Sequence, residues 1–600
     1  MIERFMVSKY KVTFLPEGIE ANIPEGTSLM QAAADAGIQM EGPCGGKGTC
    51  GKCRVLIKEE KTEKPVLACK TLVQEDMTVI IPLSEVTLLR KGENDTHDLG
   101  IRIMPGIWKK SLTVAEPELR TQKSDLTRLY EAFGQVLPLT YTALKSLPQV
   151  LRPGRNPVTA VYTDDQILSL EEGNTENQLF GLAVDIGTTT VVAALMDLIT
   201  GNVLGVASTT NSQNIFGSDV VSRIEHVINN PQGLEQLQWR SVQVVNTLID
   251  ELCSKADILP VNIYRVTIAG NTTMEHLFLG IDPRNLAPAP FIPVMTHPIE
   301  LEAREIGLQI NSHGRIHLIP NIAGYVGGDT TSVILATQVY DKPGIYLVID
   351  IGTNGEVVLS VDGKMHACST AAGPAFEGAH IKHGMRAAPG AIEGVVFNGD
   401  IFLKVIGNIS PSGICGSGLL QAVQVMLLIG VVTPSGKLIT RKEGENMCLS
   451  PSVLERLGSD KNGNYFILSY PENNREAVVI TQNDVRELQL AKGAIRTGIE
   501  VLFKEAGITA SDVNQVLLAG AFGNYLDKES AVFLGLIPDI PSERIKSIGN
   551  AAGTGARMAL ISDPLLRSAS VISKNVKHIE LSGRQDFYEM FIRYMGFDQT

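Results

Sequence analysis

The chain has 600 residues, of which 44% are hydrophobic and 20% charged, and its formal net charge at pH 7 is −13. A single hydrophobic core rarely exceeds about 250–300 residues, so this length predicts several globular domains. The negative charge argues against nucleic acid as a partner, because phosphate binding depends on clustered Lys and Arg. The N-terminus lacks the apolar core of a signal peptide, and no run approaches about 18 apolar residues. We therefore expect a soluble, cytoplasmic protein with no membrane partner.

The first motif in chain order is a glycine-rich loop that holds Cys44, Cys50 and Cys53 and is followed by a fourth cysteine, Cys69. Four thiolates are the ligand set of a 2Fe–2S cluster, and the glycines suit a loop whose amides must point at inorganic sulfide. Structural zinc usually takes two separated C-x2-C pairs, and here only Cys50 and Cys53 form one. The spacing therefore favours a 2Fe–2S cluster over zinc, with idle thiols as the least favoured alternative. The other four cysteines occur singly, and we expect them to be small core residues: Cys253, Cys368, Cys415 and Cys448.

The segments around this loop predict a small sheet with one helix. Alternating apolar residues over 11–24 indicate a hairpin, and residues 27–38 indicate a helix that is capped by Thr27 or Ser28 and ends at Gly37. Strands are expected within 53–60 and 77–82. This order resembles the β-grasp ferredoxins over about residues 8–85, and the C-x5-C-x2-C spacing is closer to the adrenodoxin-like branch than to the plant type.

The next hundred residues are less informative. Residues 90–100 are polar and predict an exposed linker, residues 124–137 predict an amphipathic helix capped by Ser124 or Asp125, and residues 158–164 and 166–172 predict short strands. No catalytic group of residues is evident. We expect a spacer and a small α/β domain.

A turn that contains Asp, Gly and Thr occurs twice. Residues 182–195 read LAVDIGTTTVVAAL and residues 347–359 read LVIDIGTNGEVVL, so Asp185 and Asp350 occupy equivalent places. Internal repetition predicts a duplicated unit. In each copy the glycine allows close approach of the backbone to a phosphate, the threonines supply donors, and the aspartate can hold Mg²⁺ through waters. Two such turns that face each other predict a polyphosphate site.

Residues 178–565 resemble the superfamily of sugar kinases, actin and heat-shock chaperone ATPases, which have two duplicated halves around a nucleotide cleft. Residues 319–336 and 549–560 resemble its two connecting helices, and residues 513–526 resemble its adenosine motif, although Gly520-Ala521 replaces the usual Gly-Gly. The resemblance implies a nucleotide site made of the two phosphate turns, the start of the first connecting helix and the adenosine turn: Asp185, Gly187, Thr188, Thr189, Thr190; Asp350, Gly352, Thr353, Asn354, Gly355, Glu356; Gly327, Gly328; and Gly520, Ala521, Phe522, Gly523.

Two further features have open interpretations. Asp329, which follows Gly327 and Gly328, either orients an attacking water, or binds the metal, or has no catalytic part. Residues 269–280 predict a helix that begins at Asn271 or Thr272, and its first turn either faces the phosphates or is an ordinary helix start.

Over essentially its full length the chain resembles the reductive activators of corrinoid proteins. The predicted fold class is multidomain, α+β and α/β: a β-grasp ferredoxin domain (1–86), a linker (87–120), a small middle domain (121–177) and an actin-like ATP-binding domain in two halves (178–600). The resemblance implies that a 2Fe–2S cluster passes one electron to cob(II)alamin on a corrinoid protein of a methyltransferase or demethylase system, which regenerates cob(I)alamin for methyl transfer. It also implies ATP and Mg²⁺ as cofactors, an external electron donor, an anaerobic host and a homodimer.

Two other functions stay open at this point. One is an ATP-driven activator of a 2-hydroxyacyl-CoA dehydratase type enzyme, although that family lacks a ferredoxin domain. The other is a redox-regulated small-molecule kinase, or an ATP-gated binding protein with the cluster as its sensor. In a kinase, ATP consumption would follow a small acceptor rather than a partner protein.

Overall fold

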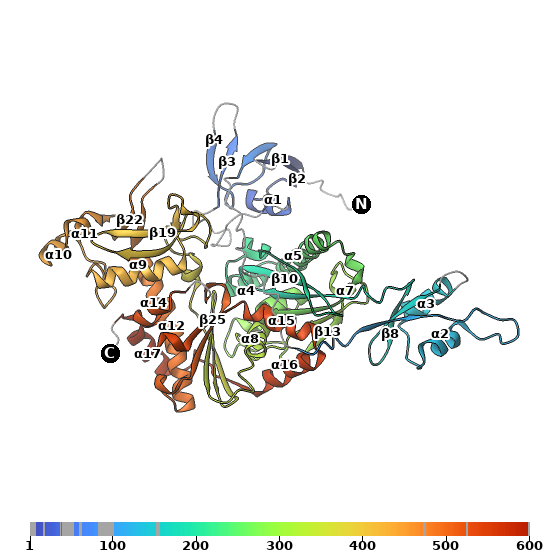
Figure 1. Cartoon of the computed structure of the whole chain (residues 1–600). Coiled ribbons are helices and arrows are strands. Elements are labelled where there is room, and N and C mark those ends of the chain that lie inside the picture. The colour runs from blue at the N-terminus through green and yellow to red at the C-terminus, as the bar shows by residue number, and fades with distance from the viewer. Residues whose placement is uncertain are drawn as a thin grey trace.

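The protein is described by a computed structural model (Figure 1), which covers residues 8–15, 18–36, 38, 48, 53–58, 63–81, 101–151, 156–461, 463–471, 476–523 and 526–597. The ferredoxin-like domain lies at the top of Figure 1, a small domain projects at the right, and two α/β halves form the body, with an outer domain at the left. Among these residues no helix is both long and apolar enough to cross a bilayer.

The N-terminal domain is a five-stranded sheet, in the order β2-β1-β5-β3-β4, with one helix packed on it. The predicted hairpin is confirmed as β1 (Lys9–Leu15) and β2 (Ile19–Pro24), and β3 (Arg54–Lys58), β4 (Glu63–Leu67) and β5 (Met77–Ile80) complete the sheet. Helix α1 (Leu29–Asp35) begins at Ser28, whose side chain accepts a hydrogen bond from the Gln31 amide. Gly37, the predicted end of this helix, lies outside the described residues.

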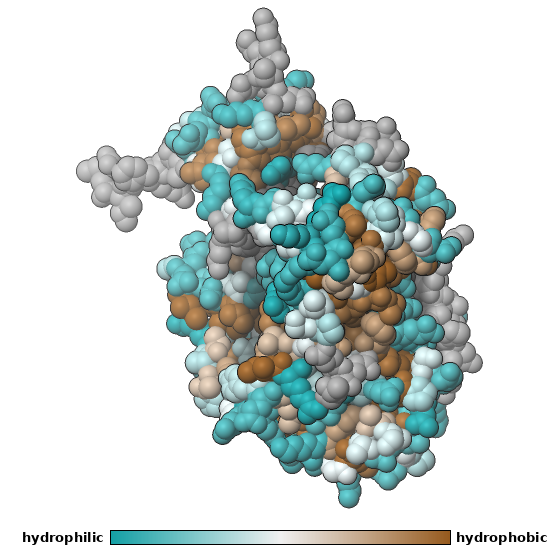
Figure 2. Space-filling view, turned by 90° about the vertical axis from the view of Figure 1, so that its left-hand side faces the viewer, coloured by the Kyte–Doolittle hydropathy of each residue, from teal (hydrophilic) through white to brown (hydrophobic). Residues whose placement is uncertain are grey.

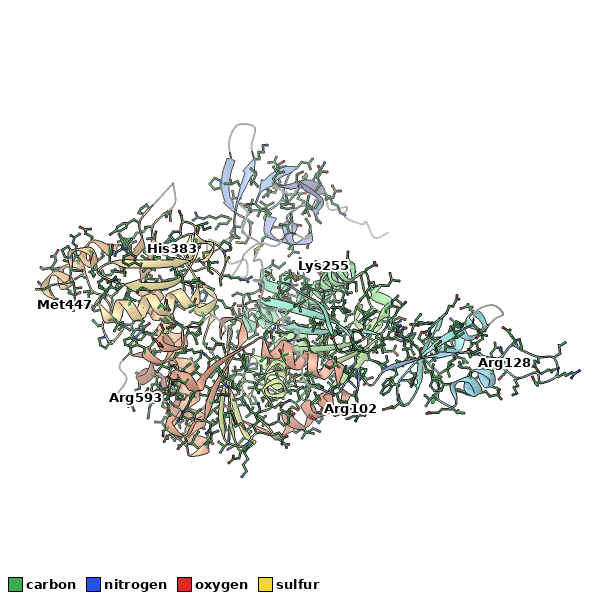
Figure 3. All side chains as sticks on the ribbon, in the orientation of Figure 1. Arg102, Arg128, Lys255, His383, Met447 and Arg593 are labelled. Carbon is green, nitrogen blue, oxygen red and sulfur yellow. The ribbon has the colours of Figure 1, made fainter. Side chains whose placement is uncertain are left out.

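The small domain is a three-stranded antiparallel sheet, β6 (Trp108–Leu112), β7 (Val158–Tyr162) and β8 (Ile167–Glu172), covered by α2 (Asp125–Phe133) and α3 (Tyr141–Val150). Ser124 caps α2, as one of the two predicted alternatives has it. Strand β6 lies within the range that the sequence predicts as linker, so the sheet of this domain begins at residue 108. Arg128, labelled in Figure 3, is buried against this sheet and pairs with Asp125.

The two halves of the body have the same sheet topology, which confirms the duplication. The first half has the order β11-β10-β9-β12-β14 and the second β17-β16-β15-β24-β25, each with two antiparallel pairs and then two parallel pairs. Each sheet gains one edge strand, β13 (Ile299–Glu302) or β26 (Val576–His578). The repeated strands are β9 (Phe180–Ile186), β10 (Thr190–Asp197), β11 (Val203–Thr210), β12 (Ile263–Gly270) and β14 (Arg315–Leu318), and β15 (Ile345–Ile351), β16 (Gly355–Val361), β17 (Lys364–Thr370), β24 (Gln515–Ala519) and β25 (Ile545–Gly549).

Helices cover both faces of each sheet, which explains the nearly continuous apolar runs in β9 and β15. Alternate residues of each strand enter an outer core, built around α5 (Gly233–Ala256) in the first half and α12 (Gln482–Ala506) in the second, or a central core shared by both halves. The central core contains the two connecting helices, α8 (Gly328–Thr337) and α15 (Ala551–Ile561). At Gly555 the helices touch without side chains between them, since a Cβ there would lie 2.1 Å from the Ser332 carbonyl oxygen.

An outer domain is inserted into the second half between β17 and α12. It has two three-stranded sheets, β18 (Ala391–Phe397), β19 (Ile401–Val405) and β20 (Gly413–Ile414), and β21 (Leu457–Asp460), β22 (Gly463–Ser469) and β23 (Val478–Thr481), with α9 (Gly416–Leu428), α10 (Arg441–Asn446) and α11 (Pro451–Arg456). Figure 2 views the molecule from this end and shows apolar patches between polar ones. Large apolar side chains of this domain that are more than half exposed are Val396, Phe402, Leu428 and Met447.

The isolated cysteines are only partly as predicted. Cys253, Cys368 and Cys415 are buried, and burial raises the pKa of Cys253 to about 11. Cys448 is exposed, so the expectation that it is a core residue is wrong. It lies between two short helices of the outer domain, a place that its single occurrence in the sequence does not reveal.

Candidate nucleotide and iron–sulfur sites

The two predicted phosphate turns both close through the amide of their glycine, and the first turn is one residue longer than the second. In the first, the Gly187 amide donates to the Thr190 carbonyl oxygen at 3.0 Å, and in the second the Gly352 amide donates to the Asn354 carbonyl oxygen at 2.9 Å. A Cβ at Gly187 would lie 2.6 Å from the Thr190 oxygen, so the turn requires glycine there. Each turn leads from a buried strand to its antiparallel partner, β9 to β10 and β15 to β16.

One carboxylate joins the two turns. The Thr189 hydroxyl of the first turn and the Thr353 hydroxyl of the second both donate to Glu377, to Oε2 and Oε1 respectively, each at 2.7 Å. Glu377 ends the short helix η4 (Pro374–Glu377). The turns of the two halves therefore face each other across the width of one carboxylate. Glu377 was not among the predicted site residues; its place in a stretch rich in Gly and Ala is only a weak local signal, since both of its partners lie far away in the sequence.

Five carboxyl groups gather beside the turns and form what we call the acidic cluster. Burial, followed by the charge of Asp329, raises the pKa of Asp185 to about 7. Burial and the charges of Asp329 and Asp185 raise the pKa of Asp350 to about 7, and burial raises that of Asp329 to about 6. The pKa values of Glu356 and Glu275 lie well above their usual range because of burial and the charge of Asp329. Each group is thus destabilised as an anion by its surroundings.

The acidic cluster fits a hydrated divalent cation. Carboxylates are the ligands of Mg²⁺, which keeps several of its waters in protein sites. Within the described chain, no three His, Cys, Asp or Glu side chains converge closely enough to hold a bare ion. Glu275 supports a place for water, since its Oε1 atom is buried and has no hydrogen-bond partner among the described residues. Asp329, at the first turn of α8, is the member whose charge reaches all four others.

Asparagines connect the first turn and the acidic cluster to helix starts. Asn271 caps α6 (Thr272–Leu279), as one predicted alternative has it, and donates to the Thr188 hydroxyl at 2.9 Å. The start of α6 therefore lies against the first phosphate turn, which agrees with the first of the two interpretations given for this helix start. Asn550, which caps α15, hydrogen-bonds Asp185 and opposes the rise of its pKa. Asn550 was not among the predicted site residues.

The glycines predicted around the site have distinct parts. Gly520 begins α13 (Gly520–Gly523) with φ of +85°, and a Cβ there would lie 2.5 Å from Asp350 Oδ1. The adenosine turn thus lies directly against the second phosphate turn. Gly327 lies against the start of α6, since its Cβ would be 2.5 Å from the Asn271 Cα. Gly328 donates its amide to Asn321 Oδ1 at 2.9 Å.

The structure therefore brings the predicted turns, Asp329 and Gly520 into one region, and their assignment as nucleotide ligands stays a prediction. The backbone of Ala521 and Phe522 belongs to α13 at the same place, followed by Gly523.

The described cysteines of the first motif also converge. The Sγ atoms of Cys53 and Cys69 are 3.2 Å apart, although the residues are 16 positions apart in the chain. Gly48 has φ of +74°, which agrees with the expected need for glycine in this loop. Cys44 and Cys50 lie outside the described residues. Two thiols this close are compatible with ligation of one iron–sulfur centre, and the ligand set stays a prediction.

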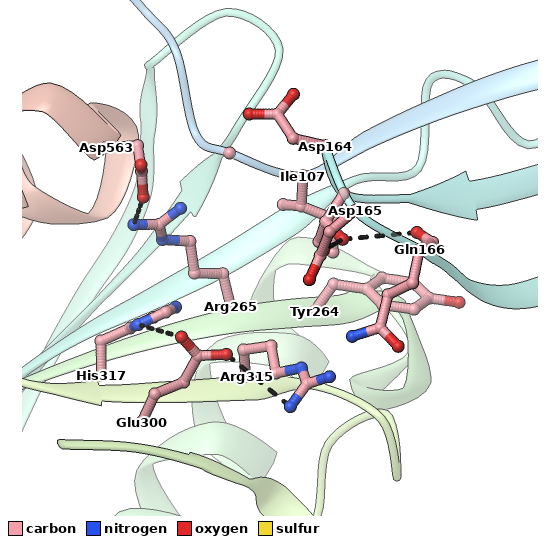
Figure 4. Close-up of a pocket in the computed structure, with 12 residues that line it drawn as sticks. Ile107, Asp164, Asp165, Gln166, Tyr264, Arg265, Glu300, Arg315, His317 and Asp563 are labelled. Carbon is pink, nitrogen blue, oxygen red and sulfur yellow. Dashed lines mark hydrogen bonds and ion pairs between the residues drawn. The ribbon is translucent and has the colours of Figure 1, made fainter. Parts of the chain in front are cut away.

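A separate polar pocket of about 200 Å³ lies between the small domain and the first half (Figure 4). Arg265 points to Asp563 at 3.0 Å, and His317 lies 3.7 Å from Glu300. Burial and the charges of Arg265 and Arg315 hold the pKa of His317 well below its usual range, so this imidazole is neutral. The pocket contains none of the predicted site residues, and its partly buried Arg265–Asp563 ion pair connects β12 of the first half to α16 (Asp563–Asn575).

Comparison with known proteins covers every part of this architecture. Residues 12–74 match a 2Fe-2S iron-sulfur cluster binding domain, 96–177 the RACo linker region, 180–342 the RACo middle region, and 344–600 the C-terminal domain of RACo, the ASKHA domain. The corrinoid activation enzyme RamQ of Eubacterium limosum is 35% identical over 584 residues, 96% of either chain. The chain belongs to the family of reductive activators of corrinoid proteins.

Two other members of this family bear further on the architecture. A solved reductive activator for a corrinoid, iron-sulfur protein is 35% identical, with 98% of both chains covered and a TM-score of 0.73. The [Co(II) methylated amine-specific corrinoid protein] reductase of Methanosarcina barkeri is 26% identical, over 69% of this chain and 76% of its own length. The predicted fold class is confirmed. As a reductive activator, the chain carries a 2Fe–2S cluster and an ATP-binding ASKHA domain.

Proposed function

We propose that this protein uses ATP to activate a corrinoid protein reductively, by passing one electron from its 2Fe–2S cluster to cob(II)alamin on that partner. The single observation that carries the proposal is that a ferredoxin domain with converging Cys53 and Cys69 and a duplicated ATPase body with facing phosphate turns occur in one chain. The presence of both parts in one chain needs an explanation, because an electron carrier needs no ATP for downhill transfer and a kinase needs no iron–sulfur cluster.

The cluster supplies one-electron chemistry at low potential. The chain contributes the rest: four cysteines that hold it, and an ATPase body whose two halves can bind nucleotide between them. Nucleotide drives an uphill transfer only if it binds one arrangement of the halves more tightly than another. The two phosphate turns, one from each half, are placed for such a difference, since a polyphosphate contacts both only when they face each other.

We assign the parts of the site as follows. The two phosphate turns hold the phosphates, the acidic cluster holds Mg²⁺ through waters, and Asp329 either binds the metal or orients an attacking water. The adenosine turn at Gly520 holds the base side of the nucleotide. The external electron donor, a homodimer, the cytoplasmic location and a partner from a methyltransferase or demethylase system belong to the same proposal and rest on the family resemblance.

Anaerobic optical spectroscopy tests this function. Reduced protein is mixed with a corrinoid protein loaded with cob(II)alamin, with and without Mg-ATP. We expect cob(I)alamin only with Mg-ATP, none with Cys69→Ser, and unchanged formation with the matched control Cys448→Ser, which alters an exposed cysteine. If the intact protein hydrolyses ATP only in the presence of a small acceptor molecule, and reduces cob(II)alamin on none of several corrinoid proteins, the result would favour the kinase alternative.

A further inference from the structure

The ferredoxin domain sits on the first half of the ATPase body through a small, defined contact. Asp35, the last residue of α1, accepts from Arg240 of α5 at 2.7 Å. The Arg240 side chain is only 5% exposed and lies over the rings of Phe216 and Trp239. Ile215 packs against the core of the ferredoxin domain. Figure 1 shows α1 on the side of this domain that faces the body. We call this contact the ferredoxin seat.

The ferredoxin seat includes a short helix whose first residues lie against the first phosphate turn. This helix, η1 (Ser212–Ile215), is capped by Asn211, whose side chain accepts from the Gln213 amide. The same Asn211 side chain donates to the Gly187 carbonyl oxygen at 2.9 Å, and its backbone amide donates to the Thr189 carbonyl oxygen at 2.9 Å. Asn211 is fully buried. One residue therefore holds both the phosphate turn and the helix that carries Ile215.

A second connection runs through Arg223, which is completely buried. Its guanidinium donates to the Thr188 carbonyl oxygen of the phosphate turn and to the side-chain oxygens of Gln213 and Asn214 in η1. Helix η1 in turn holds α5, because Gln213 donates to the Leu237 carbonyl oxygen at 2.8 Å. The groups that fix the first phosphate turn are thus the groups that fix the seat.

The chemistry of a phosphate ligand gives the sign of the coupling. A guanidinium binds a phosphate oxygen more strongly than a neutral amide oxygen, because the negative charge adds Coulomb attraction to a hydrogen bond that the cation already strengthens. A polyphosphate at residues 187–190 therefore competes for Arg223 with the neutral amide oxygens of Gln213 and Asn214. Any movement of Arg223 towards the phosphate weakens the bonds that hold η1 and, with it, Ile215.

We propose that the ferredoxin domain docks reversibly on η1 and α5, and that Mg-ATP bound at the first phosphate turn lowers the docked fraction through Asn211 and Arg223. Cys53 and Cys69 lie close to the seat: the Ala68 amide between them donates to the Cys53 carbonyl, and its carbonyl accepts from Met30 of α1. Met30 and Asp35 are five residues apart on helix α1, a separation of about 7.5 Å along the helix. Nucleotide would thus control when the cluster end of the ferredoxin domain leaves the body.

The inference rests on the nucleotide site proposed above, so its test measures nucleotide binding and docking on the same samples. The distance between the reduced cluster and a nitroxide on Cys448 can be measured by pulsed electron paramagnetic resonance in the full-length holoprotein. Cys448 is the exposed cysteine among the free cysteines of the described chain, and Figure 3 shows its neighbour Met447 at the far end of the outer domain. Calorimetry gives the dissociation constant of Mg-ATP.

We expect a defined distance for the docked domain, which Mg-ATP reduces in population. Arg240→Ala should lower the docking constant about tenfold without nucleotide, because it removes one partly exposed, charge-assisted contact. The matched control Arg284→Ala, which removes an exposed Arg–Asp pair elsewhere, should leave the distances unchanged. Linkage requires that Arg240→Ala also tighten Mg-ATP binding, by up to the factor by which Mg-ATP weakens docking. Gln213→Ala should reduce the effect of Mg-ATP on docking while the domain still docks.

Two results would overturn the inference. One is Mg-ATP that binds with a measurable dissociation constant and leaves the docked fraction unchanged or increases it. The other is Arg240→Ala with unchanged distances. Absence of any Mg-ATP binding would instead contradict the proposed nucleotide site, which keeps the two failures apart.

Discussion

Glu377 provides the sharpest test of the nucleotide site. Its carboxylate accepts from one threonine hydroxyl of each phosphate turn, Thr189 and Thr353, both at 2.7 Å. A terminal phosphate that binds both turns needs the same two donors and carries the same sign of charge. We therefore predict that Glu377→Gln tightens Mg-ATP binding, because the neutral amide is a weaker competitor and does not repel the phosphate.

The size of the effect follows from the number of bonds. A hydrogen bond to a charged group contributes about 1.5–3 kcal/mol, against roughly 1 kcal/mol for a neutral pair. Replacing one carboxylate oxygen by an amide nitrogen and neutralising the other should therefore shift binding by about 1–2 kcal/mol, or roughly 5- to 30-fold in the dissociation constant. The shift should be smaller for Mg-ADP, which lacks the terminal phosphate.

Isothermal titration calorimetry with Mg-ATP and Mg-ADP measures both shifts. Glu393→Gln is the matched control, because this glutamate makes an ion pair with Lys404 in the outer domain. A Glu377→Gln variant whose dissociation constant for Mg-ATP is unchanged or higher would refute the reasoning. It would point instead to a carboxylate that assists binding, for example by orienting water.

Three further predictions concern the same region. Gly520→Ala should destabilise the protein by roughly 2–4 kcal/mol in thermal unfolding, because it adds backbone strain at φ of +85° and a contact 2.5 Å from Asp350 Oδ1. The control Gly507→Ala, at φ of +67° with open space around it, should cost only about 1–2 kcal/mol. Equal losses for the two variants would contradict the close approach of Gly520 to Asp350. Gly555→Ala should cost about 1–3 kcal/mol and weaken nucleotide binding, since α8 and α15 must separate; an unchanged melting temperature would contradict this. The raised pKa values of the acidic cluster mean that the native state holds protons between about pH 4 and 7 that the unfolded chain has lost, so without a cation this cluster's contribution to stability falls as pH rises through that window. Mg²⁺ displaces those protons, so the binding of Mg²⁺ should become tighter from pH 6 to 7.5. Calorimetry in two buffers of different ionisation enthalpy should show that protons are released on binding. Mg²⁺ binding that does not depend on pH would contradict this prediction.

Elements with a repeated or alternating sequence pattern could be predicted from the sequence. Contacts between residues that are distant in the chain could not. Alternating residues gave the hairpin at the N-terminus, and the gap-free repeat around Asp185 and Asp350 gave the strands and turns of both halves. Ser124 and Asn271 were found because a helix start has a local signature. Glu377 was missed because its partners, Thr189 and Thr353, come from distant segments that meet only when the halves pack.

The same reason explains the misplaced cysteine and the small domain. Burial of a lone cysteine depends on its neighbours in space, so Cys448 could not be told from Cys253 by spacing. Strand β6 lies within the predicted linker; its five residues, WKKSL, include two lysines, and its pairing with β7 identifies it as a strand. Tertiary pairing thus overrode a weak local propensity.

The crossing of α8 and α15 at Gly555 has a mechanical consequence for the whole molecule. At the point where two helices touch by their backbones no side chain blocks a change of crossing angle, whereas a Cβ at Gly555 would force the helices apart. A rotation displaces each part in proportion to its distance from the axis. The phosphate turns begin beside these helices, whereas the outer domain lies at the far left of Figure 1, so the same rotation would displace the outer domain more than the turns. The crossing at Gly555 would thus act as a pivot that enlarges a small rotation near the turns into a larger displacement at the outer domain.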